Sequence, residues 1–320
     1  MLSFVIPAYN EAESLAILLS ELNEVVSAHR YDAEFIFVDD GSSDSSWNVI
    51  RQLAASDPKV CAIRFRRQFG KAAALNAGFR AARGETIVTL DADLQDDPRE
   101  IPKLLEKMNE HYDVVSGWKK IRHDPAQKVF ASRVFNWLVS RLTGVHLHDH
   151  NSGMKCYRRE IFDEVRLYGE LHRFVPVLAA ARGFRVAEVV VDHRPRRFGR
   201  SKFGPGRYFK GFLDLLTVKF LTSFGQRPQH LLGGAGLLFV LGGLAGLSYL
   251  TIYWILTRLN PDWHWTPLHD RPALLYSLGA LLFGGQLMSL AFLAELITSH
   301  HGRDSDTYSI AERINEPPAT

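Results

Sequence analysis

Short apolar runs alternate with amphipathic stretches throughout the first half of the chain. The runs are SFVIP, EFIFVDD, VCAIRF and TIVTL, and segments with helical periodicity follow them at about 13–28, 45–56, 70–82 and 98–110. This alternation predicts βαβ units around a mostly parallel sheet, and therefore a Rossmann-like α/β domain. In such sheets ligands bind beyond the carboxyl ends of the strands.

Two later segments have a different pattern, because residues 231–257 and 272–294 contain no Asp, Glu, Lys or Arg. Each is longer than the roughly 20 residues that cross a bilayer core. We predict a transmembrane hairpin; a pair of buried core helices is the alternative. The expected organisation is an α/β domain over 1–205, an interfacial helix over 206–229, a hairpin over 230–298 (spans of about 231–257 and 272–296) and a disordered tail over 299–320.

The segment RYFKGFLDLLTVKFLTSF (207–224) precedes the first span. Its apolar residues Phe209, Leu213, Leu216 and Phe220 share one helical stripe, which predicts a helix that lies on the membrane surface. The alternative is a surface helix packed on the domain.

Basic residues set the expected orientation. The N-terminus, MLSFVIPAYN, lacks the features of a secretory signal. Basic residues flank the first span on its N-terminal side, against Arg258 and Arg271 in the connecting loop; they are Arg207, Lys210, Lys219 and Arg227. The excess predicts a multi-pass protein of the inner (plasma) membrane with a cytoplasmic N-terminal domain.

Composition adds little. A net charge of +3 is too small to indicate nucleic-acid binding. Cys61 and Cys156 have no metal-ligand spacing, and a cytosolic location favours free thiols. The sequence leaves a homo-oligomer open.

Polar loops follow the four predicted strands: PAYNE (7–11), DDGSSD (39–44), RRQFGK (66–71) and DADLQDD (91–97). In an extended segment Asp91, Asp93 and Gln95 point the same way, so they can present oxygen atoms to one point. Such a set suits a hard divalent cation, Mg²⁺ or Mn²⁺.

Other acidic residues at this edge have structural explanations. Asp97, Pro98 and Glu100 match the N-cap, first and third positions of a helix, and Asp96 is treated as structural with them. Asn10 with Glu13 matches a cap in the same way, and residues 42–44 are expected to cap the next helix. The adjacent Asp39 and Asp40 repel each other unless they receive hydrogen bonds or a ligand.

The sequence argues against a dinucleotide-binding oxidoreductase and against a P-loop enzyme. No G-x-G-x-x-G follows a strand, and G-x-x-x-x-G-K-[ST] is missing.

The four loop motifs, in this order, resemble those of family 2 glycosyltransferases with the GT-A fold. More narrowly, RHDPAQKVFASRVFN, HDHNSGMKCYRRE, RPRRFGRSKFG and the two spans resemble polyprenyl-phosphate glycosyltransferases. The resemblance covers about residues 1–300. One departure is Lys155, where many relatives have Arg, and Met154 replaces an aromatic residue.

The resemblance implies an enzyme that moves a sugar from a nucleotide donor to a lipid phosphate. The implied nucleotide-binding residues are Pro7, Tyr9, Glu11, Asp39, Asp40, Lys71 and Asp91. The implied metal ligands are Asp91, Asp93 and Gln95, and the implied catalytic residues are Asp93 and Asp149. The residues implied to face the acceptor phosphate are Lys119, Arg122, Arg133, Arg197, Ser201 and Lys202.

The chemistry can be argued separately from that resemblance. A lipid phosphate that attacks the anomeric carbon inverts its configuration, and a phosphate monoester is largely a dianion at neutral pH, so it needs cations more than a base. RPRRFGRSK supplies five cations; a basic membrane anchor is the alternative. Asp149 is then a base, a sugar ligand or an orienting partner, and a second metal at His148-Asp149-His150 is disfavoured.

Two other functions compete. A polysaccharide synthase is expected to carry Q-x-x-R-W and more spans, yet the sequence has no Arg-Trp pair. A non-enzymatic membrane scaffold is expected to have eroded polar loops, and these are intact. The sugar, the nucleotide and the lipid length stay open.

Overall fold

The computed structural model describes residues 1–120, 126–165, 171–195, 197–198, 206–224, 228–260 and 267–301. The chain forms two compact units, residues 1–219 and 220–320, which are described separately. The tail after residue 301, predicted to be disordered, lies outside the described residues.

The first unit is built on a seven-stranded sheet with strand order β3-β2-β1-β4-β6-β5-β7. The strands are β1 (Leu2–Ala8), β2 (Ala33–Asp39), β3 (Val60–Arg64), β4 (Thr86–Thr89), β5 (Val114–Trp118), β6 (Lys155–Arg158) and β7 (Val186–Val190). All neighbours pair in parallel except β6, which is antiparallel to both β4 and β5. The mostly parallel sheet is therefore confirmed, with its first four strands where the sequence predicts them.

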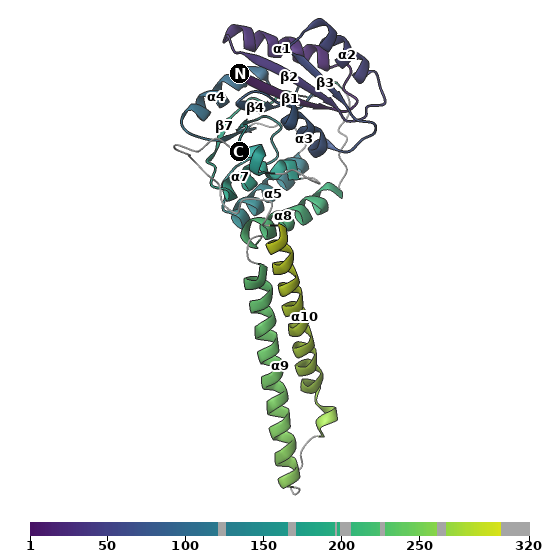
Figure 1. The fold of residues 1–320 in the computed structure, drawn as a ribbon, viewed down its shortest axis with the longest axis vertical. Coiled ribbons are helices and arrows are strands. Elements are labelled where there is room, and N and C mark those ends of the chain that lie inside the picture. The colour runs from purple at the N-terminus through teal and green to yellow at the C-terminus, as the bar shows by residue number, and fades with distance from the viewer. Residues whose placement is uncertain are drawn as a thin grey trace, which may run out of the picture. The chain divides into compact units, whose positions relative to one another are not determined.

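Helices cover both faces of this sheet (Figure 1). Those of the first unit are α1 (Leu15–Ala28), α2 (Ser46–Ser56), α3 (Lys71–Ala81), η1 (Pro98–Glu100), α4 (Ile101–Asn109), α5 (Ala126–Thr143), α6 (Ile161–Glu164), η2 (Leu171–Phe174), α7 (Val175–Ala181) and α8 (Gly206–Phe224). One buried cluster joins α1, α2 and α4 to one face, and another joins α3, α6 and α7 to the other. Successive strand residues alternate between them: Phe35 and Phe37 belong to the first cluster, Ile36 and Val38 to the second.

A third cluster packs α5 and α8 against η2 and α7 through Val139, Phe174, Leu215 and Val218. Helix α8 thus packs on the first unit through one of its faces.

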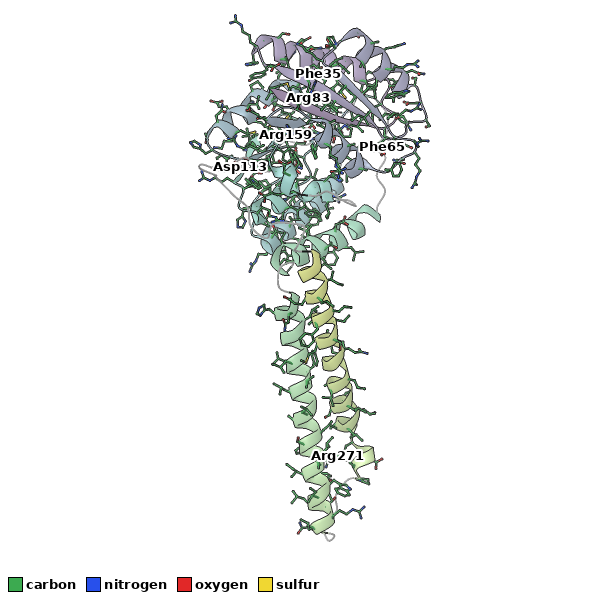
Figure 2. The ribbon with its side chains drawn as sticks, viewed as in Figure 1. Phe35, Phe65, Arg83, Asp113, Arg159 and Arg271 are labelled. Carbon is green, nitrogen blue, oxygen red and sulfur yellow. The ribbon has the colours of Figure 1, made fainter. Side chains whose placement is uncertain are left out.

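Ion pairs and hydrogen bonds tie together the edge of the sheet opposite the predicted site. Buried Glu34 accepts hydrogen bonds from Ser3 Oγ (2.6 Å) and from Arg83 N (2.7 Å) and Nε (2.9 Å). In Figure 2, Arg83, Arg159 and Asp113 follow this edge, whereas Phe65, just past the end of β3, lies at the other. The charges of Glu34 and Arg83 therefore lie at the opposite edge of the sheet from the polar motif loops.

The second unit is a helical hairpin of α9 (Pro228–Leu259) and α10 (Pro272–His301), with the short η3 (Leu268–Asp270) before α10. The stretches Leu232–Leu259 and Pro272–Ile297 are long and apolar enough to span a membrane, and only 17% and 11% of their most apolar windows are buried. The helices pack closely because Gly236 and Gly284 face each other: a Cβ on Gly284 would lie 2.7 Å from the Gly236 carbonyl oxygen. Low burial disfavours the core-helix alternative.

Candidate active site

The loops after β1 and β2 are joined by Asn10, which has a left-handed φ of 52°. Its side-chain oxygen accepts a hydrogen bond from Ser43 N at 2.8 Å, and its own N–H donates to Ser42 Oγ at 2.9 Å. The predicted Asn10–Glu13 cap is therefore wrong, since α1 begins at Leu15 and Asn10 is used to pair two loops. Residues 42–43 join that pairing instead of capping α2.

Three residues implied to bind the nucleotide lie along these loops. Pro7 is within β1, and Tyr9 and Glu11 follow it, all three half-buried. The Glu11 backbone N–H donates to Ser46 Oγ at 2.8 Å, which ties this loop to the start of α2.

Asp39 and Asp40, at the end of β2, both receive hydrogen bonds. Asp39 Oδ1 accepts from Ser42 N at 3.1 Å. Asp40 Oδ1 accepts from Phe69 N (2.7 Å) and Gly70 N (3.1 Å), which fixes the RRQFGK loop. Burial raises the pKa of Asp40, and these hydrogen bonds offset only part of the shift. The two carboxylates thus hold the loops at this edge of the sheet in place.

Lys71 and Asp91 form an ion pair where α3 begins and β4 ends. Burial raises the pKa of Asp91, but the Lys71 ammonium outweighs it, and the pKa falls to about 2. The Asp91 side chain keeps 33% of its surface exposed. Asp91 is therefore an ionised carboxylate that a ligand can reach.

The segment after Asp91 turns and is not extended as predicted. Leu94 has a left-handed φ of 60°, and Asp93 Oδ1 accepts a hydrogen bond from Gln95 N at 3.2 Å. The expected alternation nevertheless holds, since Asp91, Asp93 and Gln95 are half-exposed while Ala92 and Leu94 are buried.

Asp97 is the N-cap of η1, as predicted, and accepts from Arg99 N at 3.0 Å. Glu100 forms an ion pair with Lys103 at 2.6 Å. Asp96, by contrast, turns inward and lies 2.6 Å from the Nζ of Lys119.

Asp149 lies in the loop before β6, and Lys155 is the first residue of that strand. Asp149 is buried and accepts from Asn151 N at 3.1 Å. The Lys155 ammonium donates to the carbonyls of Ser152 (2.8 Å) and His150 (3.2 Å). Burial lowers the pKa of Lys155 to about 8, and Asp149 opposes the shift. The structure thus uses Lys155 to hold the backbone of this loop, while Met154 is part of the core.

The two histidines beside Asp149 have separate partners. His148 pairs with Glu188 and stacks on Trp118 with ring centroids 4.0 Å apart. His150 Nε2 lies 3.1 Å from Ser140 Oγ, and burial lowers the pKa of His150 to about 3. Among the described residues no three His, Cys, Asp or Glu side chains form a group that could hold a metal ion, either at residues 148–150 or around Asp91.

A groove with a volume of about 710 Å³ adjoins this cluster. Lys119, Lys120 and Arg133 line it together with the rings of Trp118 and Trp137. The groove thus contains two of the cations implied to face the acceptor. Arg197 is exposed outside the groove lining, and Arg122, Ser201 and Lys202 lie outside the described residues.

The string RPRRFGRSK does not offer all five cations. Its first, Arg194, lies 2.6 Å from Asp97 and 2.7 Å from Glu21, and its N–H donates to the Gln95 carbonyl at 2.9 Å. The expectation of five available cations is therefore wrong, because Arg194 fastens the string to the acidic loop.

Sequence reasoning underrated two residues here, Asp96 and Gly153. A Cβ on Gly153 would lie 2.6 Å from Asp91 Oδ2 and 2.9 Å from Asp96 Oδ2, so the loop before β6 can cover both carboxylates only with glycine. The polar neighbours of Asp96, Gln95 and Asp97, give no sign of an inward turn, and the contact with Lys119 joins segments 23 positions apart in the printed sequence.

Comparisons with known proteins agree with this geometry. The model of glycosyl transferase family 2 matches residues 3–166. Dodecaprenyl-phosphate galacturonate synthase of Rhizobium johnstonii is 35% identical over 95% of this chain and 89% of its own length. Undecaprenyl-phosphate 4-deoxy-4-formamido-L-arabinose transferase of Pseudomonas fluorescens is 36% identical over 92% of this chain and 84% of its own length.

Solved structures of glucosyl-3-phosphoglycerate synthase from Mycobacterium tuberculosis have the same fold. Its complex with phosphoglyceric acid aligns with a TM-score of 0.55 at 20% identity, over 68% of this chain and 79% of that one. Its complex with Mn²⁺, UDP-glucose and phosphoglyceric acid gives 0.54 at 19% identity, over the same shares. The likeness confirms the GT-A fold. Because the family model matches just over half of the chain and the two relatives align along nearly all of it, the chain belongs to glycosyl transferase family 2.

Proposed function

We propose that this protein transfers a sugar from a nucleoside diphosphate sugar to the phosphate of a polyprenyl lipid at the cytoplasmic membrane face. The observation that carries the proposal is a cluster of carboxylates, in which the pKa of Asp91 is lowered to about 2, beside a groove lined by Lys119 and Arg133. One part of this edge suits a metal-diphosphate, and the other suits an anionic acceptor. The two relatives, named as polyprenyl-phosphate sugar enzymes, support the same pairing of substrates.

Asp91 and Asp93, with Gln95, are proposed to hold a divalent cation. Their oxygen atoms are the donor type that Mg²⁺ and Mn²⁺ prefer, and their half-exposed positions leave room for substrate phosphates to complete the shell. When bound, the cation supplies positive charge that stabilises the departing diphosphate. The Mn²⁺ in the fold neighbour supports this assignment.

Other residues of the chain are assigned to nucleotide binding and to the support of Asp91. We assign Pro7, Tyr9 and Glu11 to binding of the nucleotide. Asp39 and Asp40 hold nearby loops through hydrogen bonds from backbone N–H groups. Lys71 keeps Asp91 ionised and in place.

On the acceptor side, Lys119, Arg133 and Arg197 are proposed to bind the attacking phosphate. A phosphate dianion already carries its nucleophilic electron pair, so proton removal is not required of Asp149. Asp149 instead acts on the charges of Lys119 and Lys155, which fits an orienting role. Direct attack opposite the leaving diphosphate inverts the anomeric carbon.

Apolar surfaces on the first unit support docking to a lipid surface. Helix α8 exposes Phe212, Leu213 and Leu216 on the side away from its buried Leu215 and Val218. Helix α5 exposes Phe130 (70%) and Trp137 (66%), which lie two turns apart on one face. Exposed side chains of this size favour burial in a membrane interface, which extends the interfacial assignment from α8 to α5.

A transfer assay tests the proposed function. Membranes that contain the protein are incubated with labelled nucleotide sugars (glucose, mannose, hexosamine, uronic acid or aminoarabinose), and the organic-extractable lipid is counted. We expect label in the lipid from one sugar class only with Mg²⁺ or Mn²⁺ present. Label in a water-soluble polymer would instead favour a polysaccharide synthase, and no transfer from any donor would favour a scaffold.

The orientation has its own test. Single cysteines at Asn260 and at Ser305, which lies outside the described residues, replace Cys61 and Cys156 as the labelling sites. We expect an impermeant thiol reagent to label Asn260→Cys in intact cells and to leave Ser305→Cys unlabelled. Equal labelling of the two would contradict the hairpin.

A further inference from the structure

Asp96 is an acidic residue of the DADLQDD loop that the proposed roles leave unused. Its side chain is 1% exposed, and no hydrogen-bond partner of its Oδ2 is found among the described residues. A carboxylate is rarely buried so deeply without a cation, because it loses its hydration. Here the cation is the Lys119 ammonium at 2.6 Å.

Lys119 contacts the acidic loop through Asp96 and also lines the basic groove. Its side chain is 13% exposed and lines the basic groove. Its charge also interacts with those of Asp91 and Asp149. A flexible lysine in a groove samples many rotamers, and an ion pair with a fixed carboxylate removes that freedom.

Asp96 itself is fixed from several sides. Residues 96 and 193 form a β-bridge, and Gln95 and Arg194 share a backbone hydrogen bond. The loop with Gly153 closes over its Oδ2. Helix capping does not require Asp96, since Asp97 caps η1.

We propose that Asp96 is a positioning residue, which holds the Lys119 ammonium at the junction between the acidic loop and the basic groove so that it meets the acceptor phosphate. Lysines and carboxylates then alternate along this edge: Lys71 contacts Asp91, Gly153 lies over Asp91 and Asp96, and Lys119 contacts Asp96. The inference rests on the proposed function, because it assigns the groove to the lipid phosphate.

The test compares Asp96→Asn with Asp97→Asn in the full-length protein in detergent. Asp96→Asn keeps the size of the side chain but removes the charge that holds Lys119. We expect kcat/KM for polyprenyl phosphate to fall about ten- to hundredfold, mostly through KM, as for the loss of a charge-assisted contact. The nucleotide Kd and the Mn²⁺ dependence should change less than about threefold. Asp97→Asn, which keeps a capping oxygen but loses the ion pair with Arg194, should lower thermal stability without this rise in KM.

A double-mutant cycle covers the case in which Asp96→Asn is poorly folded. If Asp96 acts through Lys119, the Asp96→Asn/Lys119→Met double variant should be no worse toward the lipid than Lys119→Met alone. Lys119→Arg should retain part of the lipid affinity in the presence of Asp96. Additive losses, or an unchanged KM for the lipid in Asp96→Asn, would overturn the positioning role.

A binding measurement separates this inference from the proposed function. Farnesyl phosphate is titrated against the intrinsic fluorescence of Trp118 and Trp137, which line the groove and report binding without turnover. A tenfold weaker Kd in Asp96→Asn supports the inference even if the wild type transfers no sugar, a result that would refute the proposed function alone. No binding of farnesyl phosphate by the wild type would overturn the inference as well.

Discussion

Two sets of carboxylates at the carboxyl edge of the sheet differ in what they face. The loop-holding set, Asp39, Asp40 and Asp97, accepts hydrogen bonds from backbone N–H groups of nearby turns. The lysine-facing set consists of Asp91, Asp96 and Asp149. Asp91 and Asp96 contact ammonium groups, and Asp149 acts on them through its charge. The comparison teaches that an acidic motif alone does not indicate chemistry: the partner of each carboxylate decides whether it builds a loop or shapes a reactive site.

Asp93 has features of both sets. It accepts a backbone hydrogen bond from Gln95, yet it lies half-exposed in the same loop as Asp91. If Asp93 is a metal ligand, Asp93→Asn should lower metal-dependent turnover by a factor on the order of 10²–10³, with the thermal midpoint nearly unchanged. Turnover is measured across a Mn²⁺ titration. Near-normal activity of the variant, or full wild-type activity in excess chelator, would contradict the metal role.

The basic string RPRRFGRSK provides a second test, because its cations are proposed to bind the acceptor phosphate. Arg197→Ala should reduce kcat/KM for the lipid about ten- to hundredfold, since a charge-assisted contact contributes about 1.5–3 kcal/mol. Arg197→Lys keeps the charge without the planar fork and should recover part of the loss.

The matched control for that experiment is Arg194→Ala. Arg194 is engaged by Asp97 and Glu21, so its removal should lower stability before it affects the lipid KM. Nucleotide-sugar affinity, measured by calorimetry with Mn²⁺, should stay constant in all three variants. A collapse of nucleotide affinity in Arg197→Ala would place Arg197 in the donor site instead.

Asp40→Asn examines the loop-holding set. The amide keeps one acceptor oxygen but places an NH2 group where the second oxygen accepts from Gly70 N, so a buried donor loses its partner and we expect a loss of about 1–3 kcal/mol in unfolding free energy. The thermal midpoint should fall by roughly 2–4 °C per kcal/mol. A variant that is equally stable but inactive would move Asp40 into the group that contacts substrate.

His150 gives a smaller, pH-dependent effect. Burial lowers its pKa from 6.5 to about 3, so the unfolded chain binds more protons between those values and stability falls as the pH drops below about 6.5. Acidification from pH 7 to pH 5 should cost about 2 kcal/mol through this residue. Thermal unfolding at both pH values should show that the cost largely disappears in His150→Gln and persists when the exposed His29 is replaced. An equal acid sensitivity in His150→Gln would show that other groups dominate.

Sequence patterns predicted the first four strands, their helices and the apolar hairpin because each is set by local periodicity. Helix α1 shows the limit of local reasoning. The Asn10–Glu13 spacing matches a cap, yet Asn10 pairs with the loop of residues 42–44, which folding brings alongside it. Strands β5, β6 and β7 were not predicted, and β6 enters the sheet antiparallel, a pairing that no local pattern specifies.

The candidate site was predictable where a motif follows a strand and unpredictable where two segments meet. The position of Asp91 beyond β4 could be predicted from the sequence, whereas its pairing with Lys71 depends on the geometry of the sheet edge. Asp96 and Asp97 are chemically identical neighbours with opposite surroundings, buried beside Lys119 and capping η1. Only the direction of the chain after Leu94 distinguishes them.

Analysis of the reaction products tests the central claim most directly. The purified protein, its nucleotide sugar, Mn²⁺ and undecaprenyl phosphate are combined, and ³¹P NMR with mass spectrometry identifies the lipid and nucleotide products. We predict a phosphodiester between the sugar and the lipid, an inverted anomeric centre and one nucleoside diphosphate released per lipid modified. A diphosphate-linked lipid with release of a nucleoside monophosphate, or a retained anomeric centre, would contradict the proposed reaction.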